Sequence, residues 1–218
     1  MPFPVWLKPV PTTESLVYPA LPEPGCIHCW WLPYQRGQAR TPLLGLLARY
    51  LQVAPETIVL EYGAQGRPRL AGPLAGRLDF NWSHSGQHAA IAVACGVQVG
   101  IDIESRRRRP RMLELARRYF APAESDALEL LDPQRQETAF WALWTGKEAV
   151  LKATGSGISH GLHRISFLPR LNNCPLDTVD GRPATDWQLR RPELDPGYST
   201  AIAWQGAPAE VTIYRMDE

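Results

Sequence analysis

Two carboxylates stand two residues apart in a segment whose apolar residues alternate strictly with other types. Over 97–104 (V-Q-V-G-I-D-I-E) this alternation predicts a β-strand. Asp102 and Glu104 would therefore share one face, roughly 6–7 Å apart at the backbone. Two unpaired carboxylates repel each other, and a divalent cation removes that conflict. Oxygen ligands suit Mg²⁺, which commonly takes one or two carboxylates together with water and substrate phosphates. The alternative is a solvated strand end with Arg106 as ionic partner.

A second group recurs every four residues in a predicted helix over 134–153. Trp144, Glu148 and Lys152 would lie on one face of this helix, with Lys147 beside it. In one interpretation Trp144 is a core residue, and Glu148 pairs with Lys152 at the surface, a contact worth about 0.3–0.5 kcal/mol. In the other, Glu148 is a third metal ligand or a general base, and Lys152 neutralises a phosphate.

A third group lies in the segment 80–86 (F-N-W-S-H-S-G), which we predict to be a loop before an apolar strand over 88–95. Ser83 and His84 could turn hydroxyl, imidazole and backbone N–H groups toward an anion. The alternative is an ordinary polar turn. A serine hydrolase is disfavoured, because Ser83 and His84 are chain neighbours that are poorly placed to bond each other and no G-x-S-x-G motif is present.

Turn signals and periodicity predict the elements that position these groups. A first strand is expected over 26–32, and a helix over 41–51 with Thr41 as N-cap. A loop-rich stretch follows over 61–79, and Gly96 would join the strands 88–95 and 97–104 into a hairpin. The remaining predictions are helices over 112–121 and 134–153, the second ended by Gly155, and short strands near 163–168, 185–190, 199–204 and 210–215.

Length and composition bound the class of protein. The 218 residues are 44% hydrophobic and 21% charged, which is ordinary for a globular protein and excludes disorder. Lys+Arg 23 against Asp+Glu 22 gives a net charge of +1, which argues against bulk affinity for nucleic acid. No apolar run approaches the ~18 residues of a membrane span. The N-terminus does not have the pattern of a signal peptide, so we expect a cytoplasmic protein without a membrane partner.

Two other motifs have less specific meaning. Cys26-Ile27-His28-Cys29 offers at most three ligands, and no second pair completes a zinc site, so we predict a structural role. The run Arg106–Arg109 is either a solvated loop or a docking surface for an acidic partner. The basic stretch 105–111 is the expected boundary between two halves, 1–105 and 106–218.

The three chemical groups occur in an order and at separations that resemble the 4′-phosphopantetheinyl transferases of the surfactin-synthetase-activating (Sfp-like) type. Three motifs carry the resemblance: F-N-x-S-H-S at 80–85, G-I-D-I-E at 100–104 and W-x-x-K-E-A-x-x-K at 144–152. A weaker match is Gly66-Arg67-Pro68, where the family usually has Gly-Lys-Pro, so that charge is kept and geometry changes.

The resemblance implies an α+β fold, a pseudo-dimer of two similar α+β halves with the active site in the cleft between them. It implies a monomeric enzyme that transfers the 4′-phosphopantetheine group of coenzyme A to a serine of an acyl, peptidyl or polyketide carrier protein. The by-product would be adenosine 3′,5′-bisphosphate. Two alternatives use the same residues: a metal-dependent nucleotide or pyrophosphate hydrolase, and a non-catalytic module that binds coenzyme A or a carrier protein.

The resemblance also assigns roles by position. Asp102, Glu104 and Glu148 would bind Mg²⁺. Glu148 is the expected general base, with Glu124 or a metal-bound water as alternatives. The catalytic residues would be Glu148, Lys152 and His84, and the residues that contact coenzyme A would be Thr41, Arg67, Ser83, His84 and Lys152.

Overall fold

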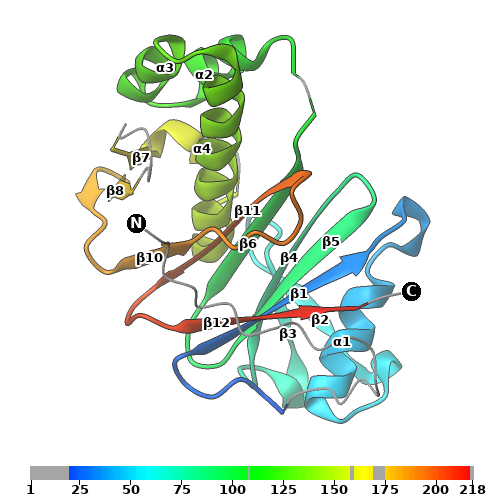
Figure 1. Ribbon diagram of the computed structural model, residues 1–218. Helices are drawn as coiled ribbons and strands as arrows, with labels where there is room; N and C mark the ends of the chain where they lie inside the picture. The colour runs from blue at the N-terminus through cyan, green and yellow to red at the C-terminus, as the bar shows by residue number, and fades with distance from the viewer. Residues whose placement is uncertain (1–19, 108, 158–159, 169–174, 217–218) are drawn as a thin grey trace, which may run out of the picture.

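Two sheets, each packed against one helix, organise the chain (Figure 1). The computed structural model describes residues 20–107, 109–157, 160–168 and 175–216. Helices and sheets are mixed along the described chain, so the predicted α+β class is confirmed, and two sheets that each pack against one helix are consistent with a pseudo-dimer. No helix within these ranges combines the length and the apolar content that crossing a membrane requires.

The first sheet has the strand order β12-β1-β5-β4. Its strands are β1 (Cys26–Pro33), β4 (Asp79–Ser85), β5 (His88–Ala94) and β12 (Glu210–Arg215). β12 runs parallel to β1, and the other pairs are antiparallel. Helix α1 (Thr41–Leu51) buries an apolar stripe against one face of this sheet, where Trp30, Phe80 and Ile91 lie.

The second sheet has the order β10-β11-β6, with β6 (Val99–Ser105), β10 (Trp187–Arg190) and β11 (Tyr198–Gln205). Helix α4 (Pro133–Thr154) lies along β6 and β11, as Figure 1 shows. The Asp132 side chain caps its N-terminus by accepting from the Arg135 backbone N–H, and Gly155, with φ at 72°, ends it as predicted.

The predicted hairpin of 88–95 with 97–104 is wrong. β5 pairs on one edge with β1 and on the other with β4, so it has no edge left for β6. β6 instead pairs with β11 in the second sheet. Its predicted alternation is confirmed, because Val99, Ile101 and Ile103 are buried together on one face.

The predicted loop at 80–86 is also wrong, since Asp79–Ser85 is strand β4. Thr41 is the first residue of α1 rather than its N-cap, which is Arg40. The predicted helix over 112–121 ends earlier, as α2 (Met112–Tyr119), and a further helix, α3 (Pro122–Glu129), follows it. Pro122 cannot continue α2 and instead begins α3.

The remaining elements are short. The loop-rich stretch 61–79 contains most of the hairpin of β2 (Leu60–Tyr62) and β3 (Pro68–Leu70). β7 (Ile165–Phe167), β8 (Leu176–Val179) and β9 (Arg182–Pro183) form a small separate sheet. Short 3₁₀ turns cover Arg36–Gln38, Pro55–Thr57, Gly72–Leu74 and Leu162–Arg164.

Candidate active site

The site is built on an unusually close approach of α4 to β6 at Gly100. A Cβ added at Gly100 would lie 2.0 Å from the Ala149 carbonyl oxygen and 2.4 Å from the Ala153 nitrogen. Only glycine therefore allows the backbones to meet here. This contact brings the carboxylates of β6 beside Glu148 and Lys152 of α4.

Asp102 is at the centre of the group and is 5% exposed. Its Oδ1 accepts hydrogen bonds from Lys152 Nζ at 2.7 Å and from Ser83 Oγ at 2.8 Å. Its Oδ2 is buried and has no hydrogen-bond partner among the residues that the structure describes. A buried carboxylate oxygen is rarely left in this condition, so the atom is suited to a ligand.

Negative charge accumulates around Asp102. Burial, followed by the Asp102 carboxylate, raises the pKa of Glu104, whose Oε2 accepts from Ser85 Oγ at 2.8 Å. Glu148 is 5% exposed, and burial together with the charges of Asp102 and Glu104 raises its pKa to about 7, although Lys152 opposes the shift. The three carboxylates thus lie within electrostatic reach of one another, as the sequence predicted.

The donor chemistry of this group fits a hard divalent cation. All donors are carboxylate oxygens, one of them lacks a partner, and clustered carboxylates favour a cation over protonation. As they stand, no three His, Cys, Asp or Glu side chains within the described ranges form a ready metal cluster. Lys152 supplies the positive charge at Asp102, and its Nζ also donates to the Ile101 carbonyl oxygen at 3.1 Å.

Ser83 and His84 lie on opposite faces of β4, because successive strand residues alternate. Ser83 faces β6 and bonds Asp102. His84 is exposed and faces the other way, stacked on Tyr34 at 4.6 Å between ring centroids, with Trp82 at 5.3 Å. Burial, Lys152 and Arg36 lower the pKa of His84, so a neutral imidazole is favoured there. The structure thus joins Ser83 to the carboxylates and separates His84 from them.

Arg67 and Lys152 border a pocket of about 190 Å³ that both halves line. Residues of the first half come from Arg40, from 65–68 and from β4, and the second half contributes the end of α4 with Gly155 and Gly157. The Arg67 guanidinium donates to Asp79 Oδ1 at 2.6 Å and to the Val99 carbonyl oxygen at 3.0 Å. The positive charge of Arg67 is therefore paired with the Asp79 carboxylate. Thr41 is exposed and does not line this pocket.

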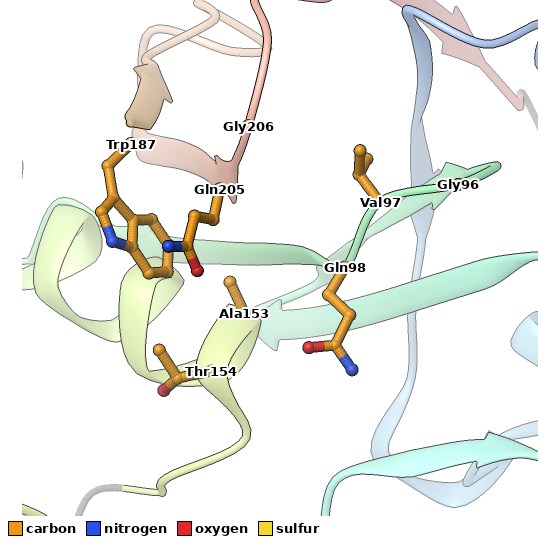
Figure 2. Close-up of a pocket in the computed structure, with 8 residues that line it drawn as sticks. All are labelled: Gly96, Val97, Gln98, Ala153, Thr154, Trp187, Gln205 and Gly206. Carbon is orange, nitrogen blue, oxygen red and sulfur yellow. The ribbon is translucent and has the colours of Figure 1, made fainter. Parts of the chain in front are cut away.

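A larger pocket, of about 270 Å³, lies beside the end of α4, which contributes Ala153 and Thr154 (Figure 2). Trp187 and Gln205 flank it on one side, and Gln98 lies across from them. The described residues that line it include no ionisable side chain. Charged side chains gather at the carboxylates and not in this lining, so the carboxylate group is the candidate site.

Lys147 and Glu124 form a structural pair rather than part of the reacting group. Lys147 is 0% exposed, and its Nζ lies 2.6 Å from Glu124 Oε2 and also donates to the Leu162 and Ile165 carbonyl oxygens. Glu124 accepts from the Ala121 and Phe167 backbone N–H groups as well. Glu124 is 1% exposed and both of its oxygens already bind protein donors, which disfavours it as the base.

The cysteine motif and the arginine run lie in different surroundings. Cys29 is fully buried, and burial raises the pKa of its thiol to about 12, whereas Cys26 is half-buried three residues away on β1. In the arginine run, Arg106 and Arg107 are exposed and Arg108 lies outside the described residues. Arg109 is half-buried, with its guanidinium over the Trp141 ring at 4.8 Å.

Reasoning from the sequence missed the contributions of Asp79, Asn81 and Ser85. Their side chains reach across from β4 and accept backbone N–H groups of β6. The signal was present as a polar residue at every second position over 79–85. That period of two indicates a strand with one polar face.

Comparison with known proteins gives consistent matches. A family model described as the 4′-phosphopantetheinyl transferase superfamily matches residues 98–203. A Synechocystis sp. protein provisionally named a 4′-phosphopantetheinyl transferase is 37% identical over 185 residues, covering 78% of this chain and 74% of that one. The 4′-phosphopantetheinyl transferase HetI of Nostoc sp. is 40% identical over 118 residues, covering 54% and 50%. The 4′-phosphopantetheinyl transferase Sfp of Bacillus subtilis is 30% identical over 196 residues, covering 85% and 84%.

Proposed function

Because the chain belongs to the 4′-phosphopantetheinyl transferase superfamily, we propose that it transfers the 4′-phosphopantetheine arm of coenzyme A to a serine of a carrier protein, with Mg²⁺ as cofactor. The carrier would be an acyl, peptidyl or polyketide carrier protein. One observation carries the proposal: Asp102, Glu104 and Glu148 share a partly buried site with Lys152, and Asp102 Oδ2 has no partner there among the described residues. The match over 84% of Sfp supports the Sfp-like type.

The proposed reaction is a displacement at phosphorus. The serine hydroxyl oxygen bonds to the phosphorus that carries pantetheine, and the bond from that phosphorus to the bridging oxygen breaks. Adenosine 3′,5′-bisphosphate leaves with that oxygen and the electron pair. The serine proton passes to Glu148, the general base of this proposal, which lies beside Asp102 and Lys152.

The other groups position the substrate and neutralise charge. Lys152, which borders the pocket of about 190 Å³, stabilises negative charge on the phosphates. Arg67 and Arg40 line the same pocket and would face the nucleotide part of coenzyme A. Contacts of Ser83, His84 and Thr41 with coenzyme A remain predictions from the resemblance.

Asp102, Glu104 and Glu148 would hold the metal ion. When bound, Mg²⁺ supplies neutralisation of the pyrophosphate and stabilisation of the leaving phosphate. With the cation present, Lys152 would no longer be needed to neutralise the Asp102 carboxylate and could bind a phosphate instead.

Intact-protein mass spectrometry of a panel of apo-carrier proteins tests the proposal. Incubation with coenzyme A and Mg²⁺ should add roughly 340 Da, one phosphopantetheine group, to at least one carrier. A chelator in place of Mg²⁺ should abolish the gain. Steady hydrolysis of coenzyme A without a mass gain on any carrier would identify a hydrolase. Binding of coenzyme A without either reaction would identify a non-catalytic module.

A further inference from the structure

β4 and β6 run side by side where the two sheets meet, but they belong to different sheets. Three backbone N–H groups of β6 donate to side chains of β4. Val99 N donates to Asp79 Oδ1 at 2.9 Å, Ile101 N to Asn81 Oδ1 at 3.1 Å and Ser105 N to Ser85 Oγ at 3.1 Å. Each pair is separated by 20 residues in the sequence, so donor and acceptor advance together along the two strands.

These side chains accept the hydrogen bonds that backbone carbonyl groups accept inside a sheet. The other edge of β6 pairs with β11, and Val99 and Ile101 are 0% exposed. Their N–H groups could not reach water, and a buried N–H without an acceptor is strongly unfavourable. Polar side chains are therefore required at these positions of β4 to accept the N–H groups of β6. A shift of β6 along β4 would break all three bonds together.

The same face of β4 also holds the carboxylates. Ser83 Oγ donates to Asp102, and Ser85 Oγ donates to Glu104 while accepting from Ser105 N. The bond between Asn81 and Ile101 N lies one residue before Asp102. Asn81 is 5% exposed and adds no charge to a site that already contains three carboxylates.

We infer that Asp79, Asn81 and Ser85 are positioning residues, which fix β6 along β4 and so place Asp102 and Glu104 opposite Glu148 and Lys152. The inference rests on the proposed function. Asn81 is the most informative member, because Asp79 also pairs with Arg67 and Ser85 also contacts a carboxylate. Leucine has the same branched arrangement of side-chain heavy atoms as asparagine but offers no acceptor to Ile101 N.

The test compares Asn81→Leu with the wild-type full chain by calorimetric titration with Mg²⁺, without coenzyme A or carrier. Residues that support metal ligands typically affect metal affinity or activity by about 10–100-fold. We expect Mg²⁺ binding to weaken about 10-fold or more, transfer to slow by a similar factor, and exchange of the Ile101 amide hydrogen to accelerate. Ile91→Val, in the buried core between the first sheet and α1 and away from β6, is the control for a general loss of stability.

The outcomes separate the two proposals. Wild-type Mg²⁺ binding and transfer in Asn81→Leu would overturn the inference and leave the proposed function intact. Equal losses in Ile91→Val would also overturn it. A wild-type protein that neither binds Mg²⁺ nor modifies a carrier would overturn the proposed function and, with it, the role of Asn81. If Asn81→Leu does not fold, Ser85→Ala takes its place, with the same direction of change expected and the same results decisive.

Discussion

Replacing Gly100 by alanine should separate the two elements that carry the site. The added Cβ would lie 2.0 Å from the Ala149 carbonyl oxygen, whereas ordinary contact begins near 3.4 Å, so the backbones must move apart by 1.4 Å (3.4 − 2.0). Both contacted atoms, this oxygen and the Ala153 nitrogen, are backbone atoms that cannot rotate away. Overpacking usually costs about 1–3 kcal/mol, and we expect Gly100→Ala to reach about 3 kcal/mol or more.

The consequence should be visible in stability and in activity. For a chain of this size 1 kcal/mol corresponds to roughly 2–4 °C in Tm, so we expect a decrease of about 6–12 °C. Misplacement of catalytic groups by about 1 Å can reduce turnover about 100-fold, and transfer should fall by that order. The measurements are thermal unfolding and transfer of phosphopantetheine to an apo-carrier.

Gly45→Ala is the matched control. Gly45 lies inside α1, and no heavy atom is within 4 Å of its added Cβ. Alanine should therefore stabilise the helix by about 0.5–1 kcal/mol and leave transfer unchanged. A Gly100→Ala protein with a Tm within about 2 °C of wild type and normal transfer would refute the close approach of β6 and α4.

Three further outcomes follow from individual contacts. Lys147→Met leaves Glu124 charged and buried, so stability should fall by about 3–5 kcal/mol in urea unfolding, and the double variant with Glu124→Gln, which removes the charge and keeps an acceptor for a backbone N–H group, should recover part of it. Burial lowers the pKa of His28 below 6.5 in the folded protein, so the unfolded chain binds the proton more readily. The free energy of unfolding should be highest above about pH 7 and should decrease as the pH falls below the pKa of histidine in the unfolded chain, near 6.5. His28→Gln should reduce this decrease, whereas His163→Gln, at the surface, should not. Replacing the exposed Arg106 and Arg107 by serine should raise the KM for an acidic carrier at low salt, where the Debye length exceeds about 8 Å, and leave the KM for coenzyme A unchanged.

The approach of Glu148 to Asp102 and Glu104 was expected only from the family resemblance. The residue pattern alone was enough to predict α4, the alternation of β6 and the shared face of Asp102 and Glu104. These features are local, since they repeat every two or four residues and need no knowledge of distant partners. Strand pairing is not local. β5 and β6 are neighbours in the chain, yet β6 pairs with β11, nearly a hundred residues later, because both edges of β5 are occupied.

The sequence pattern also did not predict which side chains of β4 bind the backbone of β6 where the two sheets meet. Asn81 and Ser85 are small and polar, which is typical of loops, but here they accept N–H groups from a strand. Arg67 was expected to face a phosphate, and the structure shows that its charge is shared with Asp79. Such pairings depend on which segments the fold brings together, and the sequence pattern alone does not determine them.

Turnover of three carboxylate variants at saturating Mg²⁺ tests the central claim most directly. Asp102→Ala, Glu104→Ala and Glu148→Ala should each lose at least ~10²-fold in transfer, the scale of losing a key stabiliser of transition-state charge. The urea midpoint of Glu148→Ala in chelator should be unchanged or higher, because burial and the neighbouring carboxylates disfavour its charge. Near wild-type transfer by any of the three would contradict the account, as would a loss of transfer by Glu148→Ala that only parallels a loss of stability.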